Sequence, residues 1–150
     1  MAQDRGRKLE TDDDLRELLA RTRTIAVLGI RSAAVADRPA FYVPAAAQKA
    51  GYRIVPVPVY EPEVTSILGE PVVRSVAAAA PVDLVDVFRK PQDLAGHLAD
   101  VLAAKPRAVW LQSGIRDEGF GEAVLAAGID LVEDRCLMVE IRRLDARPPS

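Results

Sequence analysis

Short apolar runs alternate with helical stretches along the chain, and this alternation is the main indication of the fold. The apolar runs cover residues 24–29, 52–57, 83–88, 108–112 and 129–132, and most of their positions are aliphatic. Runs of this length and composition are typical of strands that are buried on both faces of a parallel sheet. The sequence therefore predicts a parallel sheet of about five strands.

Helical patterns fill the intervals between these runs. Thr11 and three aspartates precede leucines at helical spacing, which predicts a short amphipathic helix. Further helices are predicted from Pro39 to a C-cap at Gly51 and over residues 75–80, 91–104, 117–127 and 135–144, with a short strand near Val72 and Val73. The expected fold class is α/β, a Rossmann-like, doubly wound sheet with helices on both faces and hence three layers.

The chain length of 150 residues fits a single domain over residues 1–150. Residues 1–10 are polar and residues 145–150 contain two prolines, so both segments are expected to be flexible tails. The single cysteine excludes an internal disulfide, and one cysteine with one histidine excludes a Cys/His zinc site. Only a carboxylate-rich metal site remains open from composition, and no metal-binding residue is predicted.

Charge and hydropathy narrow the possible partners. The formal net charge is −2, and no basic run with interleaved aromatic residues marks a surface for nucleic acid. No apolar run approaches the roughly 20 residues that a membrane span requires. We therefore expect a cytoplasmic protein that binds a small-molecule ligand. A protein partner of unknown identity is also possible from the sequence.

The residues that follow each predicted strand are the candidate ligand site, because ligands of doubly wound sheets bind at the carboxyl ends of the strands. Arginine or lysine follows two of the strands, which favours an anionic ligand. The candidates are Gly29, Ile30, Arg31, Ser32, Val57, Pro58, Phe88, Arg89, Lys90, Gln112 and Gly114.

A nicotinamide dinucleotide is one alternative ligand. Its fingerprint needs small residues at Gly-x-Gly-x-x-Gly spacing, whereas Gly29 is followed by Ile30 and Arg31. The first acidic residue after the second strand, Glu61, lies later than the ~20-residue offset of a ribose-binding carboxylate. An NAD(P)-binding enzyme or sensor is therefore disfavoured but remains the second hypothesis, and a module that binds no nucleotide is the third.

Several motifs occur in a recognisable order over nearly the whole chain. They are Ala26-Val-Leu-Gly29, Gly51-Tyr-Arg-Ile-Val-Pro-Val57, Ile67-Leu-Gly69, Val82-Asp-Leu-Val-Asp-Val-Phe-Arg89, Val109-Trp-Leu-Gln112 with Gly114-Ile115, and Asp134-Arg-Cys136 leading to Glu140. With these motifs the chain resembles the small CoA-binding proteins, which are related to the nucleotide-binding domain of the succinyl-CoA synthetase alpha subunit. The resemblance implies a protein that binds coenzyme A or acyl-CoA and has no catalytic activity of its own.

The resemblance also implies a role for each candidate residue. The backbone of residues 29–32 and the next helix would hold the pyrophosphate, with Arg31 and Arg38 on phosphate oxygens. The remaining candidates would line the adenosine side (Val57, Pro58), the sheet edge (Phe88, Arg89, Lys90) and the pantetheine arm (Gln112, Gly114). The chain departs from the family where Arg31 precedes Ser32 and where Pro58-Val59 replaces Asn-Pro.

Three further residue types were weighed as catalytic groups. Asp83 and Asp86 lie at odd spacing in one strand and so face opposite ways, which favours structural roles. His97 is placed in the middle of a helix and far from any strand end, which favours a structural histidine. The synthetase passes phosphate through a histidine of a second domain that this chain lacks, so the ligase reaction is not expected. Cys136, at the start of the last helix, is either a packing residue or a thiol able to form a mixed disulfide with CoA.

Overall fold

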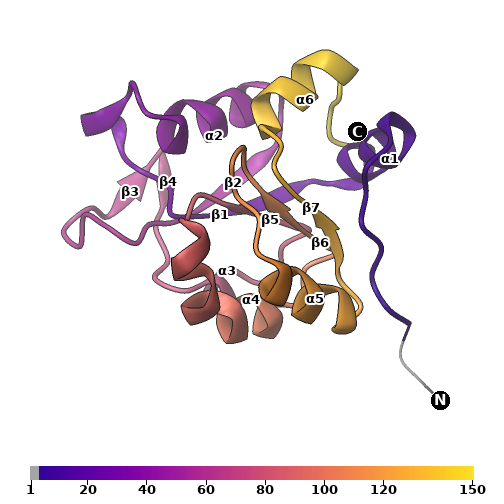
Figure 1. Ribbon diagram of the computed structural model, residues 1–150. Coiled ribbons are helices and arrows are strands. Elements are labelled where there is room, and N and C mark those ends of the chain that lie inside the picture. The colour runs from indigo at the N-terminus through magenta and orange to yellow at the C-terminus, as the bar shows by residue number, and fades with distance from the viewer. Residues whose placement is uncertain (1–3) are drawn as a thin grey trace.

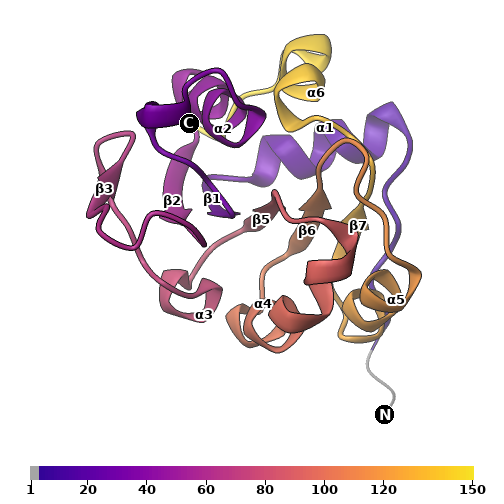
Figure 2. The same ribbon diagram turned by 60° about the vertical axis from the view of Figure 1, so that its left-hand side comes forward.

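Five parallel strands form the central sheet of the computed structural model, which describes residues 4–150. The strands are β1 (Thr24–Leu28), β2 (Arg53–Val57), β5 (Leu84–Val87), β6 (Ala108–Leu111) and β7 (Asp130–Val132). Their order across the sheet is β2-β1-β5-β6-β7, which Figure 2 shows from one edge to the other. The chain direction across the sheet reverses between β1 and β5, where ligands bind in such folds.

Helices cover both faces of this sheet. The described residues form α1 (Asp12–Arg21), α2 (Pro39–Lys49), α3 (Val76–Ala79), α4 (Leu98–Ala104), α5 (Glu118–Ala126), α6 (Leu137–Leu144) and the 3₁₀ segments η1 (Ala33–Val35) and η2 (Pro91–His97). Figure 1 shows α1, α2 and α6 above the sheet and α3, α4 and α5 below it. The predicted three-layer, Rossmann-like fold is confirmed. None of these helices has the length and apolar character that crossing a membrane requires.

The alternation of side chains along each strand divides the core into two layers. On β6, Trp110 faces α1, α2 and α6, whereas Val109 and Leu111 face the other three helices, and all three side chains are fully buried. Each such side chain contributes about 1.5–3 kcal/mol on burial. Burial on both faces explains why the strands are continuous apolar runs in the sequence.

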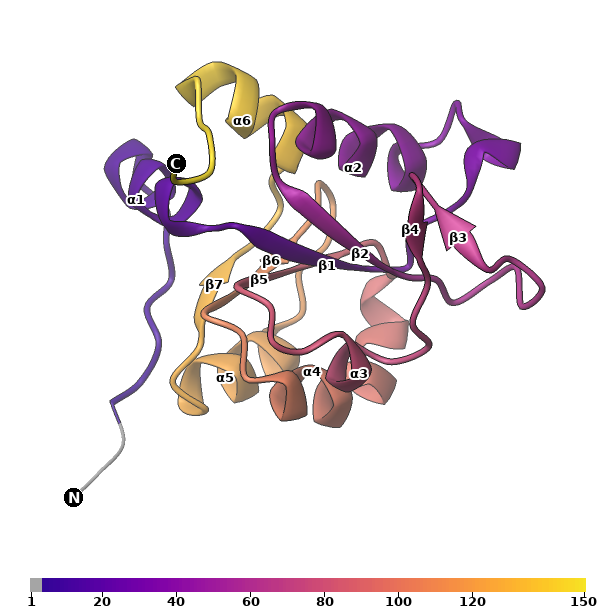
Figure 3. The ribbon, with the colours of Figure 1, turned by 180° about the vertical axis from the view of Figure 1, so that it is seen from behind.

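A β-hairpin lies beside the place where a strand was expected, near Val72 and Val73. Its strands are β3 (Ser66–Ile67) and β4 (Glu70–Pro71), which pair antiparallel. Leu68 and Gly69 between them have φ values of 56° and 78°, as a tight two-residue hairpin turn requires. Figure 3 shows this hairpin beside α2, where the Gln48 side chain donates a hydrogen bond to the Leu68 carbonyl. The expected strand lies directly before Val72 as β4, and its hairpin partner β3 was not predicted because a two-residue strand shows no periodicity.

The helix predicted over residues 91–104 is divided at His97. Its first half is the 3₁₀ segment η2, and only residues 98–104 form an α-helix. Gly96, a poor helix former, lies next to the point of change. Because a 3₁₀ helix rises further per residue than an α-helix, η2 carries His97 to a different place than a continuous α-helix would.

The two segments expected to be flexible tails pack against the domain. Met1 to Gln3 lie outside the described residues, but Leu9 is only 5% exposed, and its N–H donates to the Leu131 carbonyl of the edge strand β7. At the other end, the Arg23 guanidinium donates to the carbonyl oxygens of Pro149 and Ser150. An edge strand offers unpaired backbone groups, and residues 7–9 use them. Polar composition does not reveal such pairing.

A carboxylic acid lies fully buried in the centre of the sheet. Asp86 on β5 is opposite Val27 and Trp110, its exposed fraction is 0%, and neither carboxyl oxygen has a hydrogen-bond partner among the described residues. Burial raises the pKa of Asp86 well above its ordinary value. The carboxyl group is therefore neutral in the folded protein at acidic pH. Asp83, by contrast, accepts hydrogen bonds from the N–H groups of Arg23 and Thr24.

Replacing Leu9 with alanine tests the packing of the N-terminal segment. Leu9→Ala is expected to lower the free energy of unfolding by about 2–3 kcal/mol, because it opens a cavity beside the core. Val139→Ala, at a position that is 50% exposed, serves as the control and should change it by less than about 0.5 kcal/mol. Urea unfolding measures both, and equal effects would contradict the packing described for residues 7–9.

Asp86 makes stability depend on pH. Because the pKa of Asp86 is higher in the folded chain than in the unfolded chain, its contribution is fully present below the unfolded pKa and is lost as pH rises through the folded pKa. Asp86→Asn should flatten this dependence by up to about 1.4 kcal/mol per pH unit. Urea unfolding between pH 4 and 8 measures the slope, and the same slope in both proteins would refute this assignment.

Candidate functional site

A cavity of about 730 Å³ lies at the carboxyl ends of β1, β5 and β6 and beside the first turn of α2. Eight of the twelve residues predicted for the site line it. They are Gly29, Arg31, Arg38, Phe88, Arg89, Lys90, Gln112 and Gly114. We call this cavity the strand-end pocket. Its volume is within the range of small-molecule and cofactor sites.

The other four predicted residues are elsewhere. Ile30 is fully buried in the core, and Ser32 caps η1 with its hydroxyl, which accepts a hydrogen bond from the Ala34 N–H. Val57 and Pro58 line a separate cavity of about 320 Å³. Ile30 faces away from the pocket because side chains alternate along an extended segment. Val57 and Pro58 are apart from it because β2 lies across β1 from β5 and β6.

Gly29 is required by the backbone itself. Its φ is +87°, and a Cβ atom there would lie 2.4 Å from the carbonyl oxygen of Phe88. The ends of β1 and β5 lie close together at this point, and the Phe88 N–H donates to the Leu28 carbonyl. Glycine at this position is thus explained without a ligand.

Two arginines flank one tyrosine at the edge of the pocket. The Arg31 guanidinium carbon lies 5.1 Å from the centre of the Tyr60 ring, and that of Arg89 lies 5.5 Å from it. Both distances are in the range of cation–π contacts. Arg89 also donates from Nη1 to the Tyr60 hydroxyl at 3.2 Å. Tyr60 therefore holds both guanidinium groups, although they come from different loops.

Glu61 neutralises one of these arginines. Arg31 Nε donates to Glu61 Oε1 at 2.8 Å, and the backbone N–H of Ser32 donates to the same oxygen at 3.3 Å. Hydrogen bonds from Ser32 and Arg31 hold the pKa of Glu61 below its ordinary value, so Glu61 is ionised at neutral pH. Glu61 was weighed in the sequence only as a ribose-binding residue, and its spacing gave no sign of this contact.

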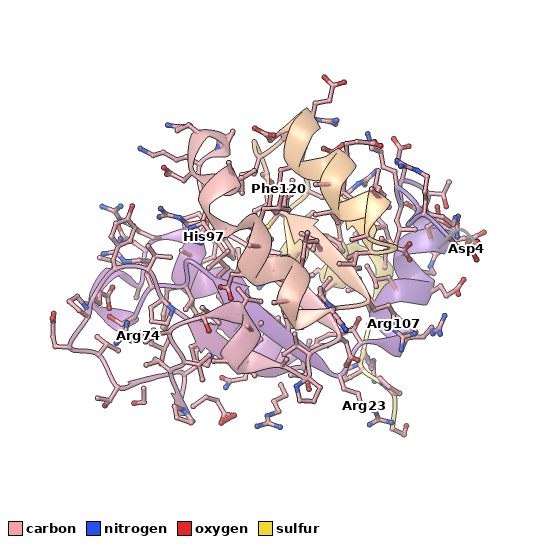
Figure 4. All side chains as sticks on the ribbon, turned by 90° about the horizontal axis from the view of Figure 1, so that it is seen from below. Asp4, Arg23, Arg74, His97, Arg107 and Phe120 are labelled. Atoms are coloured by element: carbon pink, nitrogen blue, oxygen red, sulfur yellow. The ribbon has the colours of Figure 1, made fainter. Side chains whose placement is uncertain are left out.

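The prediction that His97 is far from any strand end is wrong. Arg89 Nε donates to His97 Nε2 at 3.2 Å, directly after β5. Figure 4 shows the sheet from below, with His97 and Arg74 toward one end and with Arg23 and Arg107, which precede β1 and β6, toward the other. The path of η2 explains the difference. Burial and the Arg89 charge lower the pKa of His97, which keeps the imidazole neutral and able to accept this bond.

Two cations in the strand-end pocket are without acidic partners. Within residues 4–150 neither Arg38 nor Lys90 forms an ion pair, whereas Arg31 is paired with Glu61 and Arg89 lies 3.6 Å from Asp93. Arg38 is the N-cap of α2, an eleven-residue helix whose positive end faces the pocket. Free cations beside a helix N-terminus favour an anionic ligand.

Part of the pocket lining is apolar. Sequence reasoning missed Tyr42, Val43 and Ile115, which lie in this lining. Tyr42 and Val43 lie in a helix without a motif, so only the packing of α2 over the strand ends places them there, whereas Ile115 belongs to the Gly114-Ile115 motif and was not singled out as a site residue. Gln112 accepts a hydrogen bond from the Leu137 N–H through Oε1, which fixes the orientation of its amide.

Cys136 lines two cavities. It is a free, half-buried thiol that borders both the strand-end pocket and a neighbouring cavity of about 350 Å³. Cys136 also packs against the core, which agrees with one of the two expectations for this residue, although the side chain is only partly buried. No group of three or more potential metal ligands occurs within residues 4–150.

A scan against protein-family models matches residues 23–142 to the family described as "CoA binding domain". The chain belongs to this family. The CoA-binding-domain match begins just before β1, ends within α6 and includes every residue that lines the strand-end pocket. The predicted family is thereby confirmed, and the fold agrees with that of its structural relatives described below.

Three proteins similar to this CoA-binding-domain chain come from Bacillus subtilis, Thermus thermophilus and Pyrococcus horikoshii. Protein YneT of Bacillus subtilis (strain 168) is 32% identical over 127 residues, which cover 84% of this chain and 90% of YneT. The structure of cell-free ID.343 from Thermus thermophilus is 46% identical, with a TM-score of 0.82, and the match covers 90% of this chain and 99% of the other. A hypothetical protein from Pyrococcus horikoshii OT3 is 28% identical with a TM-score of 0.82, covering 97% and 100%.

The two glycines of the pocket allow a matched test. Gly29→Ala is expected to lower the free energy of unfolding by about 3 kcal/mol or more, because positive φ and collision with Phe88 act together. Gly114 has a φ of +80° but open space around it, so Gly114→Ala should cost only about 1 kcal/mol. Thermal and urea unfolding compare the two, and similar losses would show that the contact with Phe88 is unimportant.

Proposed function

We propose that this protein binds coenzyme A or acyl-CoA in the strand-end pocket and performs no catalysis of its own. The observation that carries the proposal is the combination of a family match over residues 23–142 with a cavity of about 730 Å³ that four cationic side chains line. CoA carries a pyrophosphate and a ribose 3′-phosphate, so its recognition requires several positive groups. Arg38 and Lys90 are available for them without losing an ion pair.

The remaining lining suits the rest of the ligand. Tyr42, Val43 and Ile115 offer apolar surface to the pantetheine arm, while Gln112 and Gly114 lie at the end of β6. A long, flexible arm binds well to an apolar wall with a few fixed polar groups. Cys136 lies on this side, where the thiol end of the ligand would arrive.

The proposal of a non-catalytic role rests on how the titratable groups are used. His97 accepts a hydrogen bond from Arg89, and Asp86 is buried in the sheet with no exposed surface. Neither group is thus arranged as a general base facing the pocket. Binding of the ligand as a signal or as cargo is the role we propose.

A nicotinamide dinucleotide is the second candidate, and one contact favours it. Glu61 follows β2 and reaches the backbone N–H of Ser32 in the loop after β1. A carboxylate at this place in a Rossmann fold can accept hydrogen bonds from the ribose hydroxyls. CoA has a phosphate on its ribose, which the Glu61 carboxylate would repel. Glu61 would therefore favour NAD and disfavour CoA if it faced the ribose.

Calorimetric titration with CoA, dephospho-CoA and NAD at matched concentrations tests the proposal. CoA is expected to bind most tightly. Lys90→Ala and Arg38→Ala should each weaken CoA binding about tenfold at low salt, because each removes a charged contact to phosphate.

The control is Arg53→Ala, an exposed arginine at the amino end of β2, which should leave CoA binding unchanged. Absence of CoA binding together with clear NAD binding would replace the proposal with its alternative. Equal losses in all three variants would show a general charge effect in place of a site.

A further inference from the structure

The Glu61 carboxylate is an anion that already occupies the Arg31 guanidinium of the strand-end pocket and the N–H of the adjacent Ser32. Its Oε1 atom accepts from both Arg31 Nε, at 2.8 Å, and the Ser32 N–H, at 3.3 Å. Arg31 lines the pocket, and Ser32 belongs to the loop that follows β1. A phosphate group and a carboxylate compete for the same guanidinium and N–H donors, because each is an anion with acceptor oxygens.

The loop that carries Glu61 is built to hold the carboxylate there. Glu61 itself has a φ of 61°, a backbone conformation that residues other than glycine rarely adopt. The Arg74 guanidinium donates to the carbonyl oxygens of Pro62 and Val64, at 3.0 and 2.6 Å. Arg74, which lies outside the strand-end pocket, thus maintains the loop conformation. The backbone of this loop places the Glu61 carboxylate at Arg31.

The carboxylate is nevertheless incompletely bound. Its Oε2 atom is buried and has no hydrogen-bond partner among the described residues. The whole side chain is only 15% exposed, so little solvent reaches it. An ionised carboxylate with one buried oxygen unpaired is a poorly satisfied occupant. A phosphate that brought its own oxygens to Arg31 and Ser32 would release Glu61 to solvent.

We propose that Glu61 is an internal competitor, which occupies Arg31 and the Ser32 N–H until phosphate groups of the ligand displace it. This inference rests on the proposed function, since it assumes that a CoA-type ligand enters the strand-end pocket. It makes Glu61 a determinant of specificity. A weakly charged ligand does not displace the carboxylate, and a ligand with several phosphates does so at the cost of some affinity.

The experiment is calorimetric titration of the full chain and of Glu61→Gln with CoA, dephospho-CoA and adenosine at low salt. The amide of Glu61→Gln still offers an oxygen to Arg31 and Ser32 but no negative charge. We expect it to tighten binding of CoA and of dephospho-CoA about tenfold, since removing a like charge is worth at least this much. Adenosine, which has no phosphate, should bind equally to both proteins.

Two controls make the result specific. Glu63→Gln removes an exposed carboxylate two residues away and should not change CoA affinity. In the background of Arg31→Ala, the gain from Glu61→Gln should shrink, because the two side chains act as one pair. Thermal unfolding without ligand verifies that each variant is folded.

The outcomes separate this inference from the function on which it rests. Equal CoA affinity in the wild-type chain and Glu61→Gln, or a similar gain for adenosine, would overturn the competitor role while leaving CoA binding intact. Binding of CoA by neither protein would instead overturn the proposed function. CoA binding that appears only in Glu61→Gln would support both.

Discussion

The close approach of Gly29 to the Phe88 carbonyl is the contact on which the site depends. It occurs where β1 and β5 end side by side, at the point where the chain direction across the sheet reverses. A side chain at residue 29 would separate these two ends. Because they remain together, the loops that follow them place Arg31 and Arg89 on the two sides of a single tyrosine ring. The positive edge of the pocket is thus a consequence of backbone packing.

The sequence predicted the layers of the fold well, because burial on both faces of the sheet leaves a strong signal. Each of the five apolar runs coincides with a parallel strand, and the helix beginning at Pro39 starts at that residue. The hairpin at residues 66–71 and the docking of Leu9 were missed. Both depend on backbone hydrogen bonding between short segments, which hydrophobic periodicity does not record.

The site was predicted less completely than the fold, for a related reason. The sequence identifies strand ends, and eight of the candidate residues there do line the pocket. It does not show which cavity a strand end borders, and Val57 and Pro58 line the separate cavity of about 320 Å³. Contacts between distant loops, such as Arg31 with Glu61, are formed by tertiary structure alone.

Some of the motif residues at the chain's C-terminal end hold the scaffold. Asp134 accepts a hydrogen bond from the Gly114 N–H, and Glu140 is buried between Arg135 and Arg143. Arg143 also pairs with Asp12, which ties α6 to α1. These interactions stabilise the layer that covers the pocket. Recurrence of a motif in a family of binding proteins therefore need not mark contact with the ligand.

Arg89 lies between the strand-end pocket and the cavity that Val57 and Pro58 line. Its guanidinium stacks on Tyr60 at the strand-end pocket and bonds to His97, which borders the cavity of Val57 and Pro58. A ligand that drew this guanidinium toward itself would break its hydrogen bond to His97. A proton would then be held more easily there, because a neighbouring positive charge has moved away. One guanidinium group thus connects the lining of one cavity, through the His97 imidazole, to the lining of the other.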